Sequence, residues 1–225
     1  MMNLTDMKVD VLNWGPCVAK LKIDDKFHSK LLSEAKASRK KENLFQKQLA
    51  GIIKKEYAFR NPNIFIPEIS RYLQLYDQTK RHWSNALVHR HAKPSKYSLQ
   101  TLWVNYQGPN EFNPPHDHSD TLSFIIYLDV PKKLKEEQKK YVGSSAGPGG
   151  ISFLYGEGDR QSITQFSVLP ETKDMWIFPS WLKHYVYPFT SKVERVSVSG
   201  NITDNVSLHA LQQGATIHEY KKNKI

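Results

Sequence analysis

The stretch Asn113–Pro131, NPPHDHSDTLSFIIYLDVP, sets two histidines two residues apart directly before an apolar run. A short apolar run of this kind, rich in β-branched and aromatic residues, is typical of a buried strand. On an extended segment, residues i and i+2 point to the same side, so His116 and His118 can converge on one cation while Asp117 points away. Because neutral imidazole binds iron, zinc, copper and nickel, the stretch predicts two ligands of a metal site.

Other residues can complete such a site. His184 follows the apolar run MWIFP, and Asp120 could join the histidines if the first segment stays extended. In VERVSVSGN, the alternation places Arg195 and Ser197 on one strand face. An inward-facing arginine is costly unless it meets an anion, and a guanidinium beside a hydroxyl suits a carboxylate. Each residue alone has a plain structural explanation, but the combination in this order favours a metal and carboxylate site.

The pattern of apolar residues along the chain changes at residue 97. Before it, helical spacing predicts helices over 24–38, 43–59 and 67–83, and two short strands open the chain at 8–14 and 18–23. After it, short segments rich in β-branched and aromatic residues are separated by Pro, Gly and Asp/Asn turns. Several short strands without intervening helices predict an antiparallel sandwich or barrel, and hence an α+β protein.

We therefore expect a mostly helical support region over 1–96, a strand-rich core over 97–205 and a C-terminal tail over 206–225. Inside the core, residues 131–150 begin with a charged run and end rich in Gly, Ser and Pro. A connection of this length in a compact domain is usually functional or disordered, and it is a candidate lid over a site.

Composition narrows the classes of protein. One cysteine among 225 residues argues against a disulfide framework and a cysteine-built zinc site. We find no apolar run long enough for a bilayer and no secretory signal, so we expect a cytoplasmic protein without membrane contact. Residues 1–100 hold 19 Lys and Arg against 9 Asp and Glu, whereas residues 101–225 hold 13 of each. The basic half could meet nucleic acid, or could simply keep the protein soluble.

Several motifs together resemble the 2-oxoglutarate- and Fe(II)-dependent dioxygenases, most of all the prolyl-hydroxylase-like branch of bacteria and their viruses. The motifs read HDH, FIIYLD, GGISF, FPSWLKH and RVSVSGN, and they cover roughly residues 98–202. The resemblance implies a double-stranded β-helix, or jelly roll, with helices supporting one face. It also implies Fe(II) as the metal, with 2-oxoglutarate and O2 as co-substrates.

The resemblance also implies roles for individual residues. His116 and His184 would be the two iron histidines, and Arg195, helped by Ser197, would bind the distal carboxylate of 2-oxoglutarate. Tyr127 would hydrogen-bond the same co-substrate, with Tyr106 as a weaker candidate.

The chain departs from the family where an Asp or Glu usually stands, because His118 occupies that position. Either His116, His118 and His184 form the ligand set, which we favour, or Asp120 supplies the carboxylate. A bulged segment that pairs His116 with Asp120 is a third arrangement. Three neutral imidazoles leave the ion at 2+, whereas one carboxylate lowers the charge of the site to 1+.

The expected activity is the oxidation of an unidentified substrate, with hydroxylation of a protein or peptide side chain favoured. A nucleic-acid-oxidising dioxygenase, a non-catalytic cupin-like metal-binding module and zinc-dependent hydrolysis are the alternatives. The last two do not explain the spacing of Arg195 and Ser197. The sequence leaves the substrate and the oligomeric state open.

Overall fold

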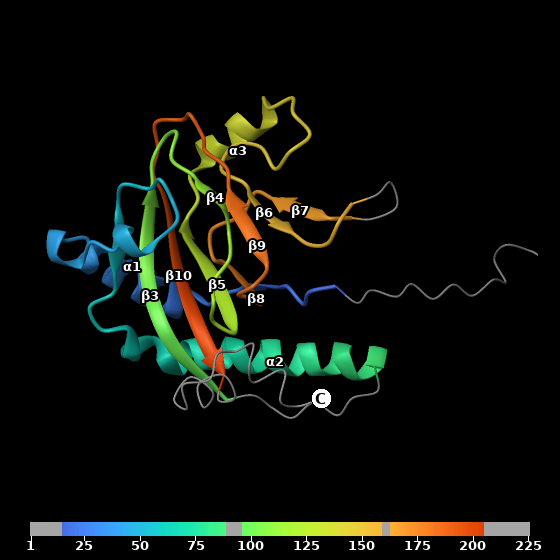
Figure 1. The fold of residues 1–225 in the computed structure, drawn as a ribbon. Helices are drawn as coiled ribbons and strands as arrows, with labels where there is room; N and C mark the ends of the chain where they lie inside the picture. Colours follow the sequence, from blue (N-terminus) through green and yellow to red (C-terminus); the bar gives the residue numbers. More distant parts are fainter. Residues whose placement is uncertain (1–14, 89–95, 159–162, 205–225) are drawn as a thin grey trace, which may run out of the picture.

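The computed structural model describes residues 15–88, 96–158 and 163–204, whose centre is two antiparallel sheets (Figure 1). The larger sheet has the strand order β1-β8-β5-β10-β3-β2, and the smaller sheet has the order β4-β9-β6-β7. The larger sheet contains β1 (Ala19–Lys22), β2 (Glu56–Ala58), β3 (Tyr97–Gln107), β5 (Leu122–Asp129), β8 (Asp174–Pro179) and β10 (Arg195–Asp204). The smaller sheet contains β4 (Asn113–His116), β6 (Ile151–Leu154), β7 (Gln165–Val168) and β9 (Lys183–Val186).

From β3 onward the chain winds back and forth between the two sheets. Strands β3, β5, β8 and β10 lie in the larger sheet, and the intervening strands β4, β6, β7 and β9 lie in the smaller one. This is the winding of a double-stranded β-helix, which brings short strands far apart in sequence into one sandwich. The expected α+β jelly roll is confirmed.

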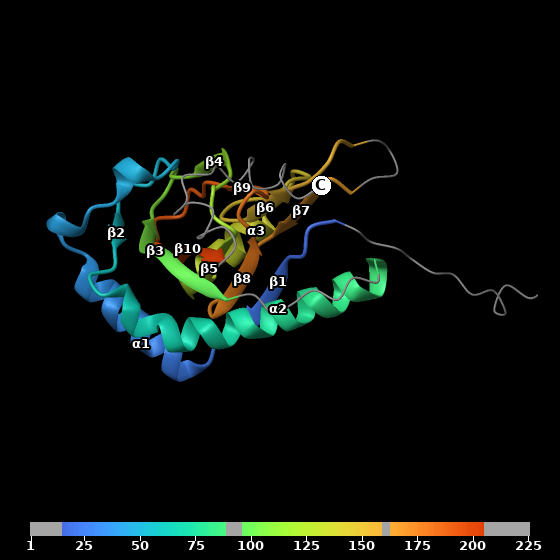
Figure 2. The ribbon, with the colours of Figure 1, turned by 60° about the horizontal axis from the view of Figure 1, so that its bottom comes forward.

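Two helices cover the outer face of the larger sheet, as Figure 2 shows. Helix α1 (Asp25–Ser38) begins after Asp24, whose side chain accepts a hydrogen bond of 2.9 Å from the Phe27 amide, as expected of an N-cap. Helix α2 (Ile66–Val88) follows the short 3-10 helix η4 (Pro62–Phe65). The helices expected over 24–38 and 67–83 and the strand expected at 18–23 are therefore confirmed.

Two clusters of buried side chains lie on the two faces of the larger sheet. The outer cluster, between helices and sheet, includes Phe27, Leu31, Tyr76, Val104 and Val198. The inner cluster, between the sheets, includes Ile125, Tyr127, Phe153, Trp176 and Phe178. Because side chains alternate along a strand, the residues of β10 on either side of Val198 point to the inner face. The polar side chains of β10 are thus aimed between the sheets.

The prediction of a helix over residues 43–59 is wrong. The structure has two 3-10 turns, η2 (Lys41–Asn43) and η3 (Gln46–Gln48), followed by strand β2, which pairs with β3. Gly51 approaches the Asn113 side chain too closely for any Cβ, and the Ile52 amide donates to the Phe112 carbonyl at 2.9 Å. Pairing with the sheet therefore overrides the helical spacing of the apolar residues.

The segment 131–150 begins with helix α3 (Lys132–Lys139), as its charged first half suggested. Leu134 of this helix is fully buried. Glu137 accepts hydrogen bonds from the backbone amides of Thr190 and Ser191 at 2.8 and 2.9 Å. These contacts attach the segment to the turn that precedes β10.

Two sequence expectations fall outside the described residues: the first strand, at 8–14, and the tail from 206 onward. Among the residues that the structure describes, no helix is long and apolar enough to cross a membrane.

Candidate metal centre

Three histidines converge at the mouth of the sandwich. His116 and His184 are direct partners in the register of β4 and β9, and their ring centroids lie 4.3 Å apart. His118 follows β4, and its ring centroid lies 5.1 Å from that of His116 and 5.4 Å from that of His184. One ligand nitrogen of each ring lies within 4.8 Å of the other two, an arrangement that can hold a single metal ion.

Strand β4 can carry this site although it contains Pro114 and Pro115. It lies at the edge of the smaller sheet, where missing amide donors cost little. The backbone amide of His118 donates to the carbonyl of Ser180 at 2.9 Å, which fixes the chain beyond the strand. The two ligand positions of the HDH motif are therefore held by the fold.

The local environment keeps His118 and His184 neutral, as metal binding requires. Burial, and secondarily the neighbouring His116, lowers the pKa of His118 to about 4 and that of His184 to about 3. Nδ1 of His116 lies 2.7 Å from the Pro114 carbonyl oxygen, and Nδ1 of His184 lies 3.0 Å from that of Leu182. Because a carbonyl only accepts, each Nδ1 carries the proton and leaves Nε2 free to bind a metal.

Asp120 is not brought to the histidines. Its Oδ1 accepts a hydrogen bond of 2.9 Å from the hydroxyl of Thr203, at the end of β10. The group of potential ligands that lie within reach of one another contains the three histidines and no carboxylate among the residues described.

Arg195 lies on the inner face of β10 as a buried cation. Its side chain is 3% exposed, Nη1 donates to the Gly149 carbonyl at 2.6 Å, and Nε has no partner. The guanidinium carbon lies 5.2 Å from the centre of the Tyr127 ring. Burial lowers the pKa of Arg195, although the group stays charged. In the described parts of the chain, no ion pair to Arg195 is found.

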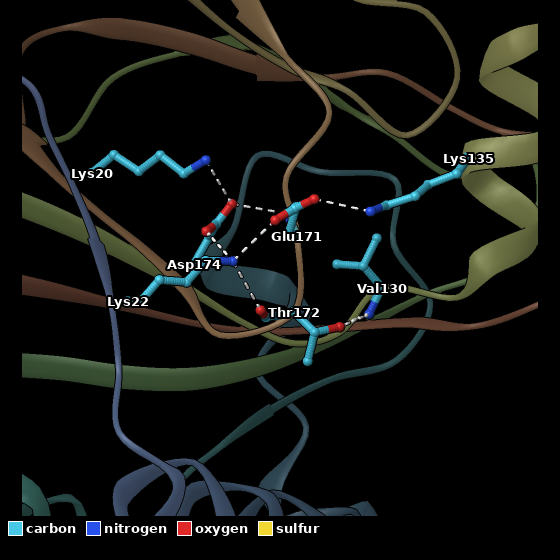
Figure 3. A network of polar contacts seen from close by, with 7 residues as sticks. All are labelled: Lys20, Lys22, Val130, Lys135, Glu171, Thr172 and Asp174. Atoms are coloured by element: carbon cyan, nitrogen blue, oxygen red, sulfur yellow. Dashed lines mark hydrogen bonds and ion pairs between the residues drawn. The ribbon is translucent and has the colours of Figure 1, made fainter.

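Glu171 and Asp174, two carboxylates that could have paired with Arg195, contact lysines instead, as Figure 3 shows. Lys22 contacts Asp174 at 2.8 Å and Glu171 at 3.2 Å. Lys135 of α3 contacts Glu171 at 2.9 Å, and these contacts with lysines lower the pKa of Glu171 to about 2. Both acids are therefore used to tie β1 and α3 to the turn before β8.

Around Arg195, buried donors lack partners. Besides Arg195 Nε, the neighbouring Tyr127 hydroxyl is buried without a hydrogen bond, and burial raises the pKa of Tyr127 to about 12. Ser197 lies directly opposite Tyr127 in the register of β10 and β5. Buried unsatisfied donors each cost about 1–3 kcal/mol. A cation with several free N–H and O–H donors fits a carboxylate such as the distal group of 2-oxoglutarate.

Tyr106 is placed differently. It belongs to the outer cluster, its ring lies 4.2 Å from the Arg39 guanidinium carbon, and it makes an edge contact with Tyr57. The structure therefore does not bring Tyr106 to the histidines or to Arg195.

A cavity of about 140 Å³ opens beside the three histidines. Its wall includes Ile125 and Ser199, and the residues two positions away on the same strands are Tyr127 and Ser197. The side chains of Arg195, Ser197 and Tyr127 thus form the next layer on the same inner face, behind this wall of the cavity. The other polar residues that line the cavity are Gln48, Glu56, Asn105, Asn113, Asp117, Ser123 and Asn201.

Sequence reasoning missed Glu56. Both of its carboxylate oxygens are buried without a partner, and its side chain is 1% exposed. Burial, and secondarily the charge of Glu111, raises the pKa of Glu56 to about 8. No sequence signal marks this residue, because it lies in a segment whose spacing predicted a helix.

Fold and site together define a metal-binding jelly roll with an anion pocket. Residues 101–201, which run from β3 into β10, match the family model described as "Putative 2OG-Fe(II) oxygenase". The segment that carries the three histidines and Arg195 matches this family model, and the resemblance inferred from the sequence is confirmed. Fe(II), 2-oxoglutarate and O2, expected from that resemblance, are the cofactor and co-substrates of the family.

Solved structures with a similar fold include a prolyl-4-hydroxylase of Pseudomonas putida, at 15% identity and a TM-score of 0.48, over 83% of this chain and 91% of that one. The viral collagen prolyl hydroxylase of Paramecium Bursaria Chlorella virus-1 is also 15% identical, with a TM-score of 0.46 over 82% of this chain and 94% of its own. HygX of Streptomyces hygroscopicus, solved with nickel and 2-oxoglutarate, is 10% identical, with a TM-score of 0.49 over 84% and 82% of the two chains. No curated protein matches the chain.

Proposed function

We propose that the chain is a 2-oxoglutarate-dependent dioxygenase that hydroxylates a protein or peptide side chain. The observation that carries the proposal is the pairing of a three-histidine cluster with a buried, uncompensated Arg195 on the inner face of one jelly roll. Neither a simple metal-binding module nor a zinc hydrolase needs that arginine. Bound Fe(II), with 2-oxoglutarate and O2, supplies the oxidative chemistry that side chains lack.

In this proposal His116 and His184 would hold the metal through Nε2, and His118 would be the third ligand. Their neutral imidazoles leave the full 2+ charge of the ion uncompensated by protein ligands. That charge would favour a dianionic co-substrate such as 2-oxoglutarate. Asp120 takes no part, because its carboxylate is already bonded to Thr203.

Arg195, Ser197 and Tyr127 bind the distal carboxylate of the co-substrate. The guanidinium and the Tyr127 hydroxyl supply charge-assisted hydrogen bonds, which are stronger than neutral ones. Their burial excludes water, which would otherwise compete for the same donors. Tyr106 is left out of this set because it lies on the other face of the sheet.

The regions expected from the sequence fit this function. Residues 97–205 would form the catalytic core, and residues 1–96 would support it. Strands β1 and β2 extend the larger sheet, and α1 and α2 cover its outer face. The segment 131–150 touches the arginine pocket through Gly149 and is the candidate lid.

A non-catalytic metal-binding module is the second candidate, and one observation favours it: the ligand set lacks the carboxylate usual in the family. The only observation that supports nucleic-acid oxidation is the net positive charge of residues 1–100.

Turnover distinguishes the candidates. Purified protein with Fe(II), 2-oxoglutarate and O2 should form succinate, and a peptide substrate should gain the mass of one oxygen atom. His184→Ala should abolish both products. A protein that binds iron but forms no succinate with any peptide would support the non-catalytic module.

A further inference from the structure

Glu56 is a buried acid that the site described so far does not use. In the register of the larger sheet, Tyr127 of β5 faces Ser197 of β10, Ser197 faces Asn105 of β3, and Asn105 faces Glu56 of β2. Cross-strand partners share a face of a sheet, so these four side chains form one polar row on the inner face. Glu56 ends this row at the opposite side from the arginine pocket.

No cation of the described chain compensates Glu56. Lys55, its neighbour, contacts Glu194 at 3.0 Å, and Arg39 contacts the same Glu194 at 2.8 Å. Glu111, whose charge helps to raise the pKa of Glu56, is itself an acid. It accepts hydrogen bonds from the backbone amides of Gly108 and Lys54. Lys55 and Arg39 are thus paired with Glu194 and not with Glu56.

The carboxylate lines the same cavity as the three histidines. It is not one of the potential ligands within reach of one another, so it stands apart from the metal cluster. Leaving a buried carboxyl group unpaired costs free energy, and a protein gains nothing from it unless a ligand completes the pair.

Trp103 lines the same cavity as Glu56, and it lies two residues before Asn105, the cross-strand partner of Glu56. Its Nε1 donates to the side chain of Asn105 at 3.0 Å, and its ring centroid lies 6.3 Å from that of His118. An aromatic ring next to a carboxylate is an arrangement that suits a positively charged nitrogen group. A neutral amide would suit it less, because it brings no charge to balance the carboxylate.

We propose that Glu56 is the counter-ion for a cationic nitrogen group of the substrate, an ammonium or a guanidinium, that enters the cavity beside the histidines. The inference rests on the proposed function and deepens it by naming the substrate class: a lysyl or arginyl side chain of a protein or peptide. A cationic group that is buried in this cavity needs a counter-ion, and the three neutral histidines do not supply one.

The state of the free carboxyl group supports this reading. Its raised pKa, about 8, means that Glu56 holds a proton near neutral pH when the cavity is empty of substrate. A cation that pairs with the carboxylate would displace that proton. Binding should therefore release close to one proton at neutral pH, and a neutral ligand should release none.

The test uses full-length protein loaded anaerobically with Fe(II) and 2-oxoglutarate, immobilised and offered two mixed pools of capped peptides with randomised flanks. The central residue is arginine in one pool and citrulline, its neutral isostere, in the other; a second pair compares lysine with norleucine. Mass spectrometry of the retained peptides should give an enrichment of arginine or lysine over its neutral analogue of about tenfold or more.

Glu56→Gln should abolish that enrichment, whereas Glu42→Gln, the same change at an exposed site, should leave it intact. Equal enrichment by the wild type and Glu56→Gln, or a preference of the wild type for the neutral analogues, would overturn the proposal. Calorimetry of the best arginine peptide in two buffers of different ionisation enthalpy measures the released proton independently. Release of no proton would also overturn it.

Failure of the proposed function would look different. In that case the wild type would form no complex with Fe(II) and 2-oxoglutarate. The peptide capture would then be repeated with immobilised metal-free protein. Should Glu56→Gln not fold, Glu56→Met serves as the second variant, and proton release by the wild type still decides the question.

Discussion

His116 and His184 lie directly opposite each other on β4 and β9, with ring centroids 4.3 Å apart, although a large part of the jelly roll separates them in sequence. The register of the short edge strand β4 against its neighbour β9 therefore sets the geometry of the metal centre. A shift by one residue would turn one ring to the other face of the sheet. The site depends on strand pairing as much as on the identity of the ligands.

The ligand set can be tested by comparing His118→Ala with Asp120→Ala. Loss of His118 should weaken Fe(II) binding by at least about tenfold, since one of three neutral ligands disappears. Loss of Asp120 should leave Fe(II) affinity within about twofold and cost only the hydrogen bond to Thr203, about 1 kcal/mol of unfolding free energy. Anaerobic metal titration and thermal unfolding measure the two effects. The reverse pattern would assign the third ligand to Asp120.

Arg195→Met removes a buried cation without shortening the side chain much. We expect the dissociation constant of 2-oxoglutarate to rise about 100-fold, because a charge-assisted contact with a carboxylate contributes about 1.5–3 kcal/mol. Without 2-oxoglutarate, the variant should unfold at least as late as the wild type, since its buried charge has no counter-ion to lose. Arg60→Met, at an exposed site, is the control. A severe loss of stability without co-substrate would instead make Arg195 a structural residue.

Tyr127 and Tyr106 form a matched pair, because both hydroxyls are buried without a partner but on opposite faces of the larger sheet. Tyr127→Phe should weaken 2-oxoglutarate binding by about tenfold, the value of one good hydrogen bond. Tyr106→Phe should not change it. Calorimetric titration of both variants checks this, and equal effects would contradict the assignment of the pocket to the inner face.

Glu56 should make the stability of the metal-free protein depend on pH. Its pKa is about 8 in the folded protein against an ordinary value of 4.5, so folding favours its protonated form. The wild type should therefore lose stability relative to Glu56→Gln as pH rises from about 4.5 to 8, by up to about 1.4 kcal/mol per pH unit. Glu111, Asp117 and the three histidines of the cavity lie nearby, so the quantity compared is the difference in stability between the two proteins. Parallel stability profiles would show that Glu56 is not protonated in the fold.

The strand-rich core was predictable because several of its strands are long or apolar enough to be recognised as strands from their sequences. β5 and β10 alternate or run apolar over eight and ten residues, and their motifs locate His116 and Arg195. The alternation in β10 also indicated that Arg195 and Ser197 share a face. Strand β4 was expected only as an extended segment, since it contains two prolines, and strands β7 and β9 were not identified, because each has four residues that are partly exposed.

The region before β3 was predicted less well. The apolar residues of 43–59 have helical spacing, yet Ile52 is 58% exposed and Phe45 packs on Trp103. Local spacing does not encode the pairing of β2 with β3, which depends on a partner far along the chain. For the same reason no local pattern indicated that Glu56 reaches the cavity, or that Tyr106 points away from it.

The central claim is that the histidines and Arg195 assemble one centre for Fe(II) and 2-oxoglutarate. The most direct measurement is an anaerobic Fe(II) titration with and without 2-oxoglutarate that follows the visible charge-transfer band of the chelate, in the wild type, His184→Ala and Arg195→Met. We predict a band that needs both Fe(II) and 2-oxoglutarate, is absent in His184→Ala and, in Arg195→Met, appears only at much higher 2-oxoglutarate. Iron binding that ignores 2-oxoglutarate, or no iron binding at all, would contradict the account.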